Sequence, residues 1–381
     1  MPLLLILLNA GVLVWFLAPP PAGVYKLRLD LDVYRLGAEV WLAGGDLYGR
    51  LPATVIGNHL PFTYPPISAV LFTPFTVVPY VVASFALTVL SIVGVGYVVV
   101  IVLRALGVRP TWVLVGGLLP LALLLEPVRG TLYFGQINVL LMVLVAADCL
   151  VRKPKWPRGL LVGIAAAIKL TPAAFVLFFL LRGDRRAAIT AGASFLVTTA
   201  IGFLLNWSGS VKYWSSTLFN PDRIGKVTQE SNQTINGFLA RLGIERGMLW
   251  LVLVAVVLAV GVVAVRHAVD PVHALGLNAL VVLLVSPVSW SHHWVWALPL
   301  LLATGVTAWR TRTRPALALL GGGLLVFVLS PHWWWDSDDG ANLLSLTIGQ
   351  AYLWCALGVL GWSAHRQFRR PRVDVDHRAV A

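Results

Sequence analysis

Two aspartates near the N-terminus carry the side chains best suited to act as a general base. Asp30 and Asp32 open a stretch with apolar residues at helical spacing that stops at Gly44 and Gly45, which predicts a short amphipathic helix. A carboxylate beside a reacting hydroxyl can accept its proton. Positions two apart on a helix point to nearly opposite sides, so only one of the two can face a given site. From the residues alone, Asp30 is expected at the helix N-cap and Asp32 as a solvated acid of the first turn.

A pair of histidines forms the second chemical feature. His292 and His293 are adjacent, so on a helix their rings diverge by about 100 degrees and make a poor chelating pair, unlike histidines four residues apart. No metal site is therefore predicted here. One imidazole could donate a hydrogen bond to a phosphate or a sugar hydroxyl, and the alternative is a neutral, packed or interfacial histidine.

Other polar residues occur in or beside apolar segments. Gln136 and Asn138 must find partners once buried, either a substrate or a neighbouring helix. Lys169 must face protein, water or an anion, or reach the interface with its ammonium group. Tyr64 lies in a proline-rich stretch that is either a rigid connector or a cavity wall.

Two further clusters have equally open interpretations. Glu126 and Arg129 are close enough in sequence to form a pair. The three tryptophans at 333–335 are typical of an aromatic belt, and the acidic residues that follow them leave sugar stacking open.

The composition of the chain indicates what kind of structure must position these residues. Of 381 residues, 58% are apolar and 12% are charged, against roughly 25% charged residues in a soluble domain. A membrane protein is predicted, which excludes a cytosolic enzyme, a disordered scaffold and a secreted disulfide framework. Cys149 and Cys355 both lie in or at the edge of apolar runs, so no disulfide or cysteine-rich metal site is expected.

Ten apolar runs approach the length of about 17–25 residues that a membrane-spanning helix needs. They are residues 3–17, 79–103, 111–125, 136–151, 187–205, 248–265, 272–285, 294–309, 315–330 and 343–362. The first run could instead be a signal peptide, although no basic residue precedes it. Residues 65–78 are expected to form a short interfacial helix, and residues 159–181 either a re-entrant hairpin or two short crossings.

Alternate threading of these runs places 18 of the 29 lysines and arginines on one side. By the positive-inside rule that side is cytoplasmic, together with both termini. The net charge of +13 is therefore a topology signal, and no nucleic-acid partner is predicted. The expected organisation is one transmembrane domain over residues 1–365 and a basic cytoplasmic tail over 366–381. No feature fixes an oligomeric state.

The polar segments gather in the loops of the opposite, extracytoplasmic side. A transporter or flippase for lipid-linked sugars is an alternative, but it would place charges near the membrane midplane and show related halves. Only Lys169 is a good intramembrane charge. A cavity at the outer leaflet, where a lipid-borne substrate meets a polar acceptor, is the preferred interpretation.

A set of motifs in one order gives the sequence a family resemblance. It resembles the actinobacterial polyprenyl-phosphate-mannose-dependent α-(1→2) mannosyltransferases of the GT-C superfamily, relatives of the enzymes that elongate phosphatidylinositol mannosides and lipomannan. The motifs are Asp30-Leu31-Asp32-Val33-Tyr34, Asp46-Leu47-Tyr48, Phe62-Thr63-Tyr64-Pro65-Pro66, Gly135-Gln136-Ile137-Asn138, Ala167-Ile168-Lys169-Leu170-Thr171-Pro172, Asn232-Gln233-Thr234, and Ser286-Pro287 followed by His292-His293-Trp294.

The resemblance implies an all-α, GT-C-like polytopic membrane fold with about 10–12 transmembrane helices and an amphipathic helix in the first outer loop. It also implies an inverting transfer of mannose from polyprenyl phosphate mannose to a glycolipid or glycan acceptor, in the plasma membrane with the active site extracytoplasmic. The family acid falls on Asp30, which reverses the N-cap interpretation. Asp32 occupies a variable position and is the alternate acid.

The remaining polar residues are candidates for substrate binding, and the groups available to balance the charge of the donor phosphate are His292 or His293 with Lys169, Arg223 or Arg129. A sugar phosphate is already a good leaving group, so a base suffices and neither a metal nor a cofactor is required. Another polyprenyl phosphate sugar, such as an arabinofuranosyl donor, is the alternative substrate. The expected binding residues are His292, His293, Tyr64, Gln136, Asn138, Lys169, Arg223, Asn232 and Gln233.

Overall fold

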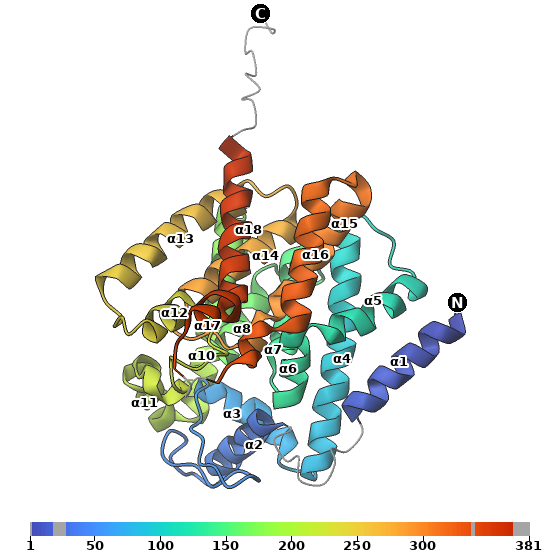
Figure 1. The fold of residues 1–381 in the computed structure, drawn as a ribbon. Coiled ribbons are helices and arrows are strands. Elements are labelled where there is room, and N and C mark those ends of the chain that lie inside the picture. Colours follow the sequence, from blue (N-terminus) through green and yellow to red (C-terminus); the bar gives the residue numbers. More distant parts are fainter. Residues whose placement is uncertain (1, 18–27, 337–339, 369–381) are drawn as a thin grey trace, which may run out of the picture.

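The computed structural model describes residues 2–17, 28–336 and 340–368, and every regular element in these ranges is a helix (Figure 1). The all-α membrane fold predicted from the sequence is confirmed. Most of the predicted basic tail lies outside the described residues. The single β-bridge of the described chain joins Asn232 to Trp290.

Within the described part of the chain, four helical segments are long and apolar enough to cross a membrane unaided. A fifth candidate is a pair of helices bent by 73°. The four are α4 (Tyr80–Ala105), α10 (Arg185–Leu205), α13 (Met248–Arg266) and the segment Leu343–His365, which includes α17 (Leu343–Thr347) and most of α18 (Ala351–Phe368); the bent pair is α5 (Trp112–Leu124) and α6 (Glu126–Phe134).

The other predicted crossings coincide with shorter helices. These are α1 (Pro2–Leu17), α7 (Asn138–Leu150), α14 (Pro271–Val285), α15 (Ala297–Thr311) and α16 (Arg314–Leu329). Because each is shorter than the usual spanning length, a total of 10–12 spans stays a prediction.

Residues 159–181 form a helical hairpin rather than a single span. α8 (Leu160–Ile168) has nine residues, a length of roughly 14 Å that is about half of the hydrocarbon core. The extended backbone of Lys169 ends α8, and the chain returns through η2 (Thr171–Phe175) and α9 (Val176–Leu181). Arg158 Nε lies 3.9 Å from Asp184 Oδ2, so both ends of the hairpin meet, and Lys169 is near its tip.

Close packing against α10 fixes this hairpin. A Cβ added at Gly163 would overlap the Ala191 carbonyl oxygen, and one at Gly159 would overlap the Ala187 carbonyl oxygen. The two glycines therefore allow α8 and α10 to approach backbone to backbone.

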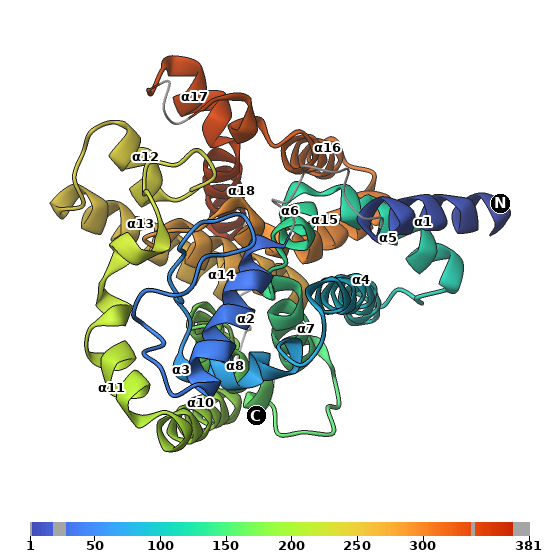
Figure 2. The ribbon, with the colours of Figure 1, turned by 90° about the horizontal axis from the view of Figure 1, so that it is seen from below.

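The end of the bundle opposite the C-terminal end of α18 is covered by short helices (Figures 1 and 2). The predicted first-loop helix is α2 (Leu29–Leu42), and the predicted interfacial helix is α3 (Pro66–Phe72), followed by η1 (Thr73–Phe75). The remaining short elements are α11 (Trp207–Ser215), η3 (Thr217–Phe219), η4 (Pro221–Ile224), α12 (Ile235–Arg241), η5 (Ser291–Trp296), η6 (Pro331–Trp334) and η8 (Ile348–Gln350).

The N-cap prediction for Asp30 is wrong. The N-cap of α2 is Arg28, which adopts a left-handed conformation with φ 67° and caps no backbone N–H through its side chain. Asp30 is therefore already inside the first helical turn, where its carboxylate is free for other contacts.

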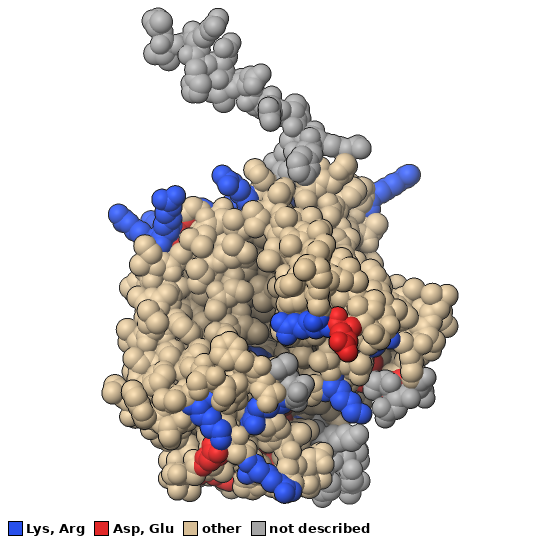
Figure 3. All heavy atoms as spheres, turned by 90° about the vertical axis from the view of Figure 1, so that its left-hand side faces the viewer, with Lys and Arg blue, Asp and Glu red and all other residues tan. Residues whose placement is uncertain are grey.

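Charged side chains are distributed unevenly along the molecule. At the end at which α18 finishes, lysines and arginines protrude with few acidic side chains beside them, whereas toward the α2 end basic and acidic side chains are mixed (Figure 3). This asymmetry agrees with the charge pattern from which the topology was predicted.

Candidate active site

The Asp30 carboxylate is held by an amide from the segment between α6 and α7. The Gln136 side chain forms a hydrogen bond with Asp30. The Oε1 atom of Gln136 accepts hydrogen bonds from the hydroxyls of Tyr34 (2.9 Å) and Tyr64 (3.0 Å). Because the amide oxygen receives both hydroxyls, the amide NH₂ group is left to donate to Asp30.

Tyr34 is a member of this group that the site prediction missed. Its hydroxyl lies 2.8 Å from that of Tyr64, and its side chain is buried. The signal was present in the sequence, since Tyr34 follows Asp30 by four residues and so lies on the same helix face.

A glycine allows the amide to approach α2. Gly135 has a φ of 69°, and an added Cβ would lie 3.0 Å from the Cβ atoms of both Arg28 and Leu31. A larger residue would be strained in this backbone conformation and would push the Gln136 segment away from the first turn of α2.

Burial raises the pKa of Asp30 to about 6, although the Gln136 hydrogen bond and the Lys169 charge both lower it. At neutral pH the carboxylate is therefore mostly ionised. It is also more basic than an ordinary aspartate, which is the property that a general base requires.

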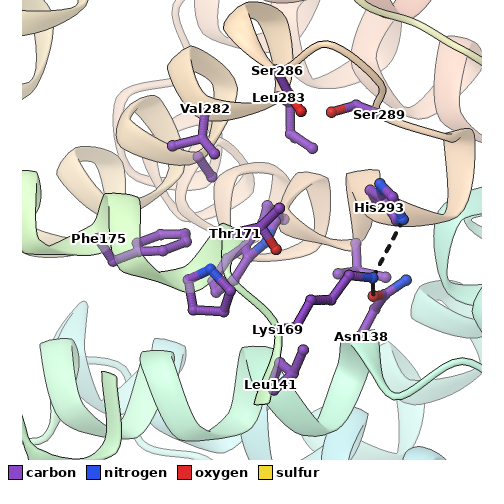
Figure 4. A pocket seen from close by; sticks show the side chains of 14 residues that line it. Asn138, Leu141, Lys169, Thr171, Phe175, Val282, Leu283, Ser286, Ser289 and His293 are labelled. Atoms are coloured by element: carbon purple, nitrogen blue, oxygen red, sulfur yellow. Dashed lines mark hydrogen bonds between the residues drawn. The ribbon is translucent and has the colours of Figure 1, made fainter. Parts of the chain in front are cut away.

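Lys169, Asn138 and His293 form a second group beside the first. Lys169 Nζ donates a hydrogen bond to Asn138 Oδ1 at 2.9 Å and lies 3.4 Å from His293 Nε2 (Figure 4). It also stands 5.2 Å from the centre of the Tyr64 ring, in cation–π geometry. Tyr64 thus contacts both groups.

The two histidines differ in their surroundings. The His292 backbone carbonyl accepts hydrogen bonds from Thr131 Oγ1 and Asn138 Nδ2, both at 3.1 Å, and its ring packs against Phe134. His293 instead faces the Lys169 cavity. Burial lowers the pKa of both histidines, and the nearby Lys169 charge lowers it further, so both imidazoles are neutral.

The cavity beside Lys169 has a volume of about 40 Å³ and combines a polar end with apolar walls (Figure 4). Such a lining suits a small charged group attached to a hydrocarbon chain. Its polar side chains are Asn138, Lys169, Thr171, Ser286, Ser289 and His293, and its apolar ones include Leu141, Phe175, Val282, Leu283 and Trp296.

Glu126 holds the segment that contains the two histidines through a hydrogen bond from Ser291. It is buried and accepts hydrogen bonds from Ser291 Oγ (2.8 Å), Trp333 Nε1 (3.0 Å) and the Tyr352 hydroxyl (2.9 Å). The expected pair with Arg129 is replaced by these three neutral donors, and Arg129 acts on Glu126 only through its charge.

The amides Asn232 and Gln233 stabilise the chain leading into the histidines. Asn232 Oδ1 accepts from the Ser289 N–H at 3.1 Å, and the Gln233 N–H donates to the Ser289 carbonyl at 3.1 Å. The Gln233 side chain donates to the carbonyls of Glu230 and Gly349. Their visible role is positioning.

Two other predicted residues lie apart from the Asp30–Lys169 group. Arg223 Nη2 is 3.5 Å from the Phe62 carbonyl. Asp32 Oδ2 accepts from the Val55 N–H at 2.7 Å, on the other side of α2 from Asp30, as the helical spacing predicted. The expectation of a solvated acid is wrong, because Asp32 is 6% exposed and its carboxylate binds this backbone N–H. Among the described residues, no group of three or more His, Cys, Asp or Glu side chains is arranged to hold a metal ion.

Comparison with known proteins shows which family this sequence matches. The model of glycosyltransferase family 87 matches residues 62–287, a range that includes Tyr64, Gln136, Asn138 and Lys169, whereas Asp30 and His293 lie outside it.

Curated relatives extend the match. A polyprenol-phosphate-mannose-dependent α-(1-2)-phosphatidylinositol mannoside mannosyltransferase of Mycobacterium tuberculosis is 46% identical over 77% of this chain and 74% of its own length. A phosphatidylinositol pentamannoside mannosyltransferase of Mycolicibacterium smegmatis, also polyprenol-phosphate-mannose-dependent and α-(1-2), is 35% identical over 78% of this chain and 74% of its own. Among solved structures, apo ArnT from Cupriavidus metallidurans is 15% identical, with a TM-score of 0.45 over 95% of this chain and 76% of that one.

Proposed function

This chain belongs to glycosyltransferase family 87, and we propose that it transfers mannose from polyprenyl phosphate mannose to a hydroxyl of a phosphatidylinositol mannoside, with Asp30 as the general base. The observation that carries the base assignment is the half-buried Asp30 carboxylate, whose pKa is raised to about 6 and which Gln136 orients. The names of the relatives supply the donor and acceptor classes.

The proposed reaction is a single displacement with inversion. The acceptor oxygen attacks C1 of the β-linked mannose, and its proton passes to the Asp30 carboxylate. The bond between C1 and the phosphate oxygen breaks, and polyprenyl phosphate leaves with the bonding electrons. Because phosphate is a good leaving group, the scheme uses no acid catalyst, metal or cofactor.

The donor phosphate is proposed to bind at the polar end of the Lys169 cavity. Lys169 supplies a positive charge, and the neutral His293 ring supplies a hydrogen-bond donor, which is the combination that a phosphate and a developing negative charge require. The apolar wall that includes Phe175 and Leu283 suits the first part of the prenyl chain.

The reaction is proposed to occur at the extracytoplasmic face of the plasma membrane. This assignment depends on the Lys/Arg asymmetry of the loops. It is tested by cysteine labelling in intact cells with an impermeant maleimide. Asn58→Cys, exposed near α2, should be labelled, and Lys153→Cys, exposed in a basic loop, should not; the reverse pattern would contradict the proposed face.

The function itself is tested with membranes that contain the full chain. Labelled polyprenyl phosphate mannose and phosphatidylinositol mannosides should give a labelled, α-linked product and free polyprenyl phosphate, equally with and without EDTA. Use of a polyprenyl phosphate arabinofuranose donor instead, or movement of the donor across vesicles without transfer, would contradict the proposal.

A further inference from the structure

A second cavity of about 240 Å³ is lined by residues of α12, η6, α17 and η8 and of the described chain beside them. It is separate from the Lys169 cavity, and nothing in the proposed reaction uses it. Its lining includes Glu230, Arg241, His332, Trp335 and Gln350. The volume is slightly below the range of about 300–1,000 Å³ typical of ligand pockets, a size that suits one sugar ring.

Unpartnered polar atoms point to a ligand in this cavity. His332 is 1% exposed, and neither of its ring nitrogens has a hydrogen-bond partner. The Nε atom of Arg241 is buried without a partner as well. Buried polar groups are almost always satisfied, so a bound molecule with hydroxyl groups would complete the hydrogen bonding of a histidine that lines the cavity wall.

The charge balance favours a neutral ligand over a phosphate. Arg241 already donates to the carbonyls of Gln229 and Asn232 and to Gln350 Oε1, and the Glu230 charge acts on it. Burial lowers the pKa of His332 to about 3, which keeps the ring neutral.

The chemistry of the lining matches a carbohydrate. Sugar hydroxyls both donate and accept hydrogen bonds, and the lining offers a carboxylate, an imidazole and an amide. The indole of Trp335 is partly exposed and supplies a broad apolar surface for the C–H face of a sugar ring.

A chain of side-chain contacts joins the wall of this cavity to the proposed reaction centre. His332 Nε2 lies 4.0 Å from Glu126 Oε1, and the same oxygen accepts from Ser291, the residue before His292. Figure 2, viewed from the α2 end, shows α12 and α17 beside α18 on the side of the molecule that also displays α2. To occupy the second cavity, a glycan bound at the Asp30 site would have to extend along this face.

We propose that this cavity, lined by Trp335, His332 and Glu230, is an acceptor subsite that binds a sugar ring preceding the one that is glycosylated. The proposal depends on the proposed function for the identity of the acceptor. It predicts that a disaccharide acceptor binds more tightly than a monosaccharide because of this cavity, and that this difference does not depend on bound donor.

The test uses the purified full chain in nanodiscs with octyl α-mannoside and octyl α-mannobioside as acceptors. Wild type should prefer the disaccharide. Trp335→Leu and Glu230→Gln should lower kcat/KM for the disaccharide about tenfold or more, equivalent to about 1.4 kcal/mol, while kcat/KM for the monosaccharide and the apparent donor KM stay within about twofold. Trp334→Leu is the matched control, since Trp334 is 57% exposed and does not line the cavity.

Binding of mannobiose without donor, measured by saturation-transfer NMR, separates the subsite from the reaction. Mannobiose binding by wild type and its loss in both cavity variants would support the subsite, even if no transfer is detected. The absence of transfer would then count against the proposed function alone. Equal losses for the two acceptors, or a Trp334→Leu protein that behaves like Trp335→Leu, would overturn the subsite.

Discussion

Lys169 Nζ lies 3.4 Å from Nε2 of His293, although 124 residues separate them in the chain. The tip of the 159–181 hairpin carries the lysine, η5 carries the histidine, and the Asn138 amide at the start of α7 contacts both elements. One cation and one neutral imidazole therefore face the same cavity, which is the basis of the predictions about the donor phosphate.

Replacement of His293 should affect donor use more than replacement of His292. We expect His293→Ala to raise the apparent KM for polyprenyl phosphate mannose about tenfold or more, because a hydrogen bond to a charged group contributes about 1.5–3 kcal/mol. His292 is fixed by its backbone carbonyl, so His292→Ala should change donor KM less. Initial rates across donor concentrations decide this, and the opposite ranking would move the phosphate contact to His292.

The pH dependence of kcat/KM should have an acid limb near pH 6. Asp30 must be ionised to accept a proton, and its pKa is raised to about 6, so kcat/KM should fall about tenfold per pH unit below that value. The donor is a phosphodiester and does not titrate in this range.

The position of this limb should respond to Lys169. Because the Lys169 charge lowers the pKa of Asp30, Lys169→Met should move the limb of the remaining activity to higher pH. Asp32→Asn, on the other helix face, is the control and should leave the limb in place. If the limb moved in Asp32→Asn instead, the titrating group would be Asp32 and the assignment to Asp30 would be contradicted.

Glu126 should contribute to stability through its three donors. Glu126→Leu leaves Ser291, Trp333 and Tyr352 without their acceptor, at a cost of about 1–3 kcal/mol each, so the unfolding temperature in detergent should fall by several degrees. Glu126→Gln keeps one oxygen acceptor and should lose less. Fluorescence-monitored unfolding at one scan rate compares the variants, and equal stability of Glu126→Leu and wild type would contradict this role.

The spacing of residues along the sequence predicted part of the candidate site. It did not predict contacts between segments that are distant in the chain. The opposite orientations of Asp30 and Asp32 follow from helical periodicity and are confirmed by the Gln136 and Val55 contacts. The N-cap assignment failed because Arg28 takes the left-handed conformation, which is rare for arginine and leaves no local pattern.

Residues that act through long-range contacts were harder to assign. The hydrogen bond from Tyr34 to Gln136 spans 102 positions, so the helix face of Tyr34 could be predicted but not its partner. Asn232 and Gln233 belong to a family-like motif, yet the structure shows them holding the Ser289 backbone. A motif indicates that residues matter without distinguishing substrate contact from positioning.

The assignment of Asp30 as the base is tested most directly by mannose transfer with Asp30→Asn. The amide keeps the size of the side chain and can still accept the Gln136 hydrogen bond, but it cannot take the acceptor proton. The protein should fold normally and lose about 10²–10⁴ in kcat, whereas Asp32→Asn, which can still accept the Val55 N–H, should remain active. Near-normal transfer by a folded Asp30→Asn protein would contradict the account.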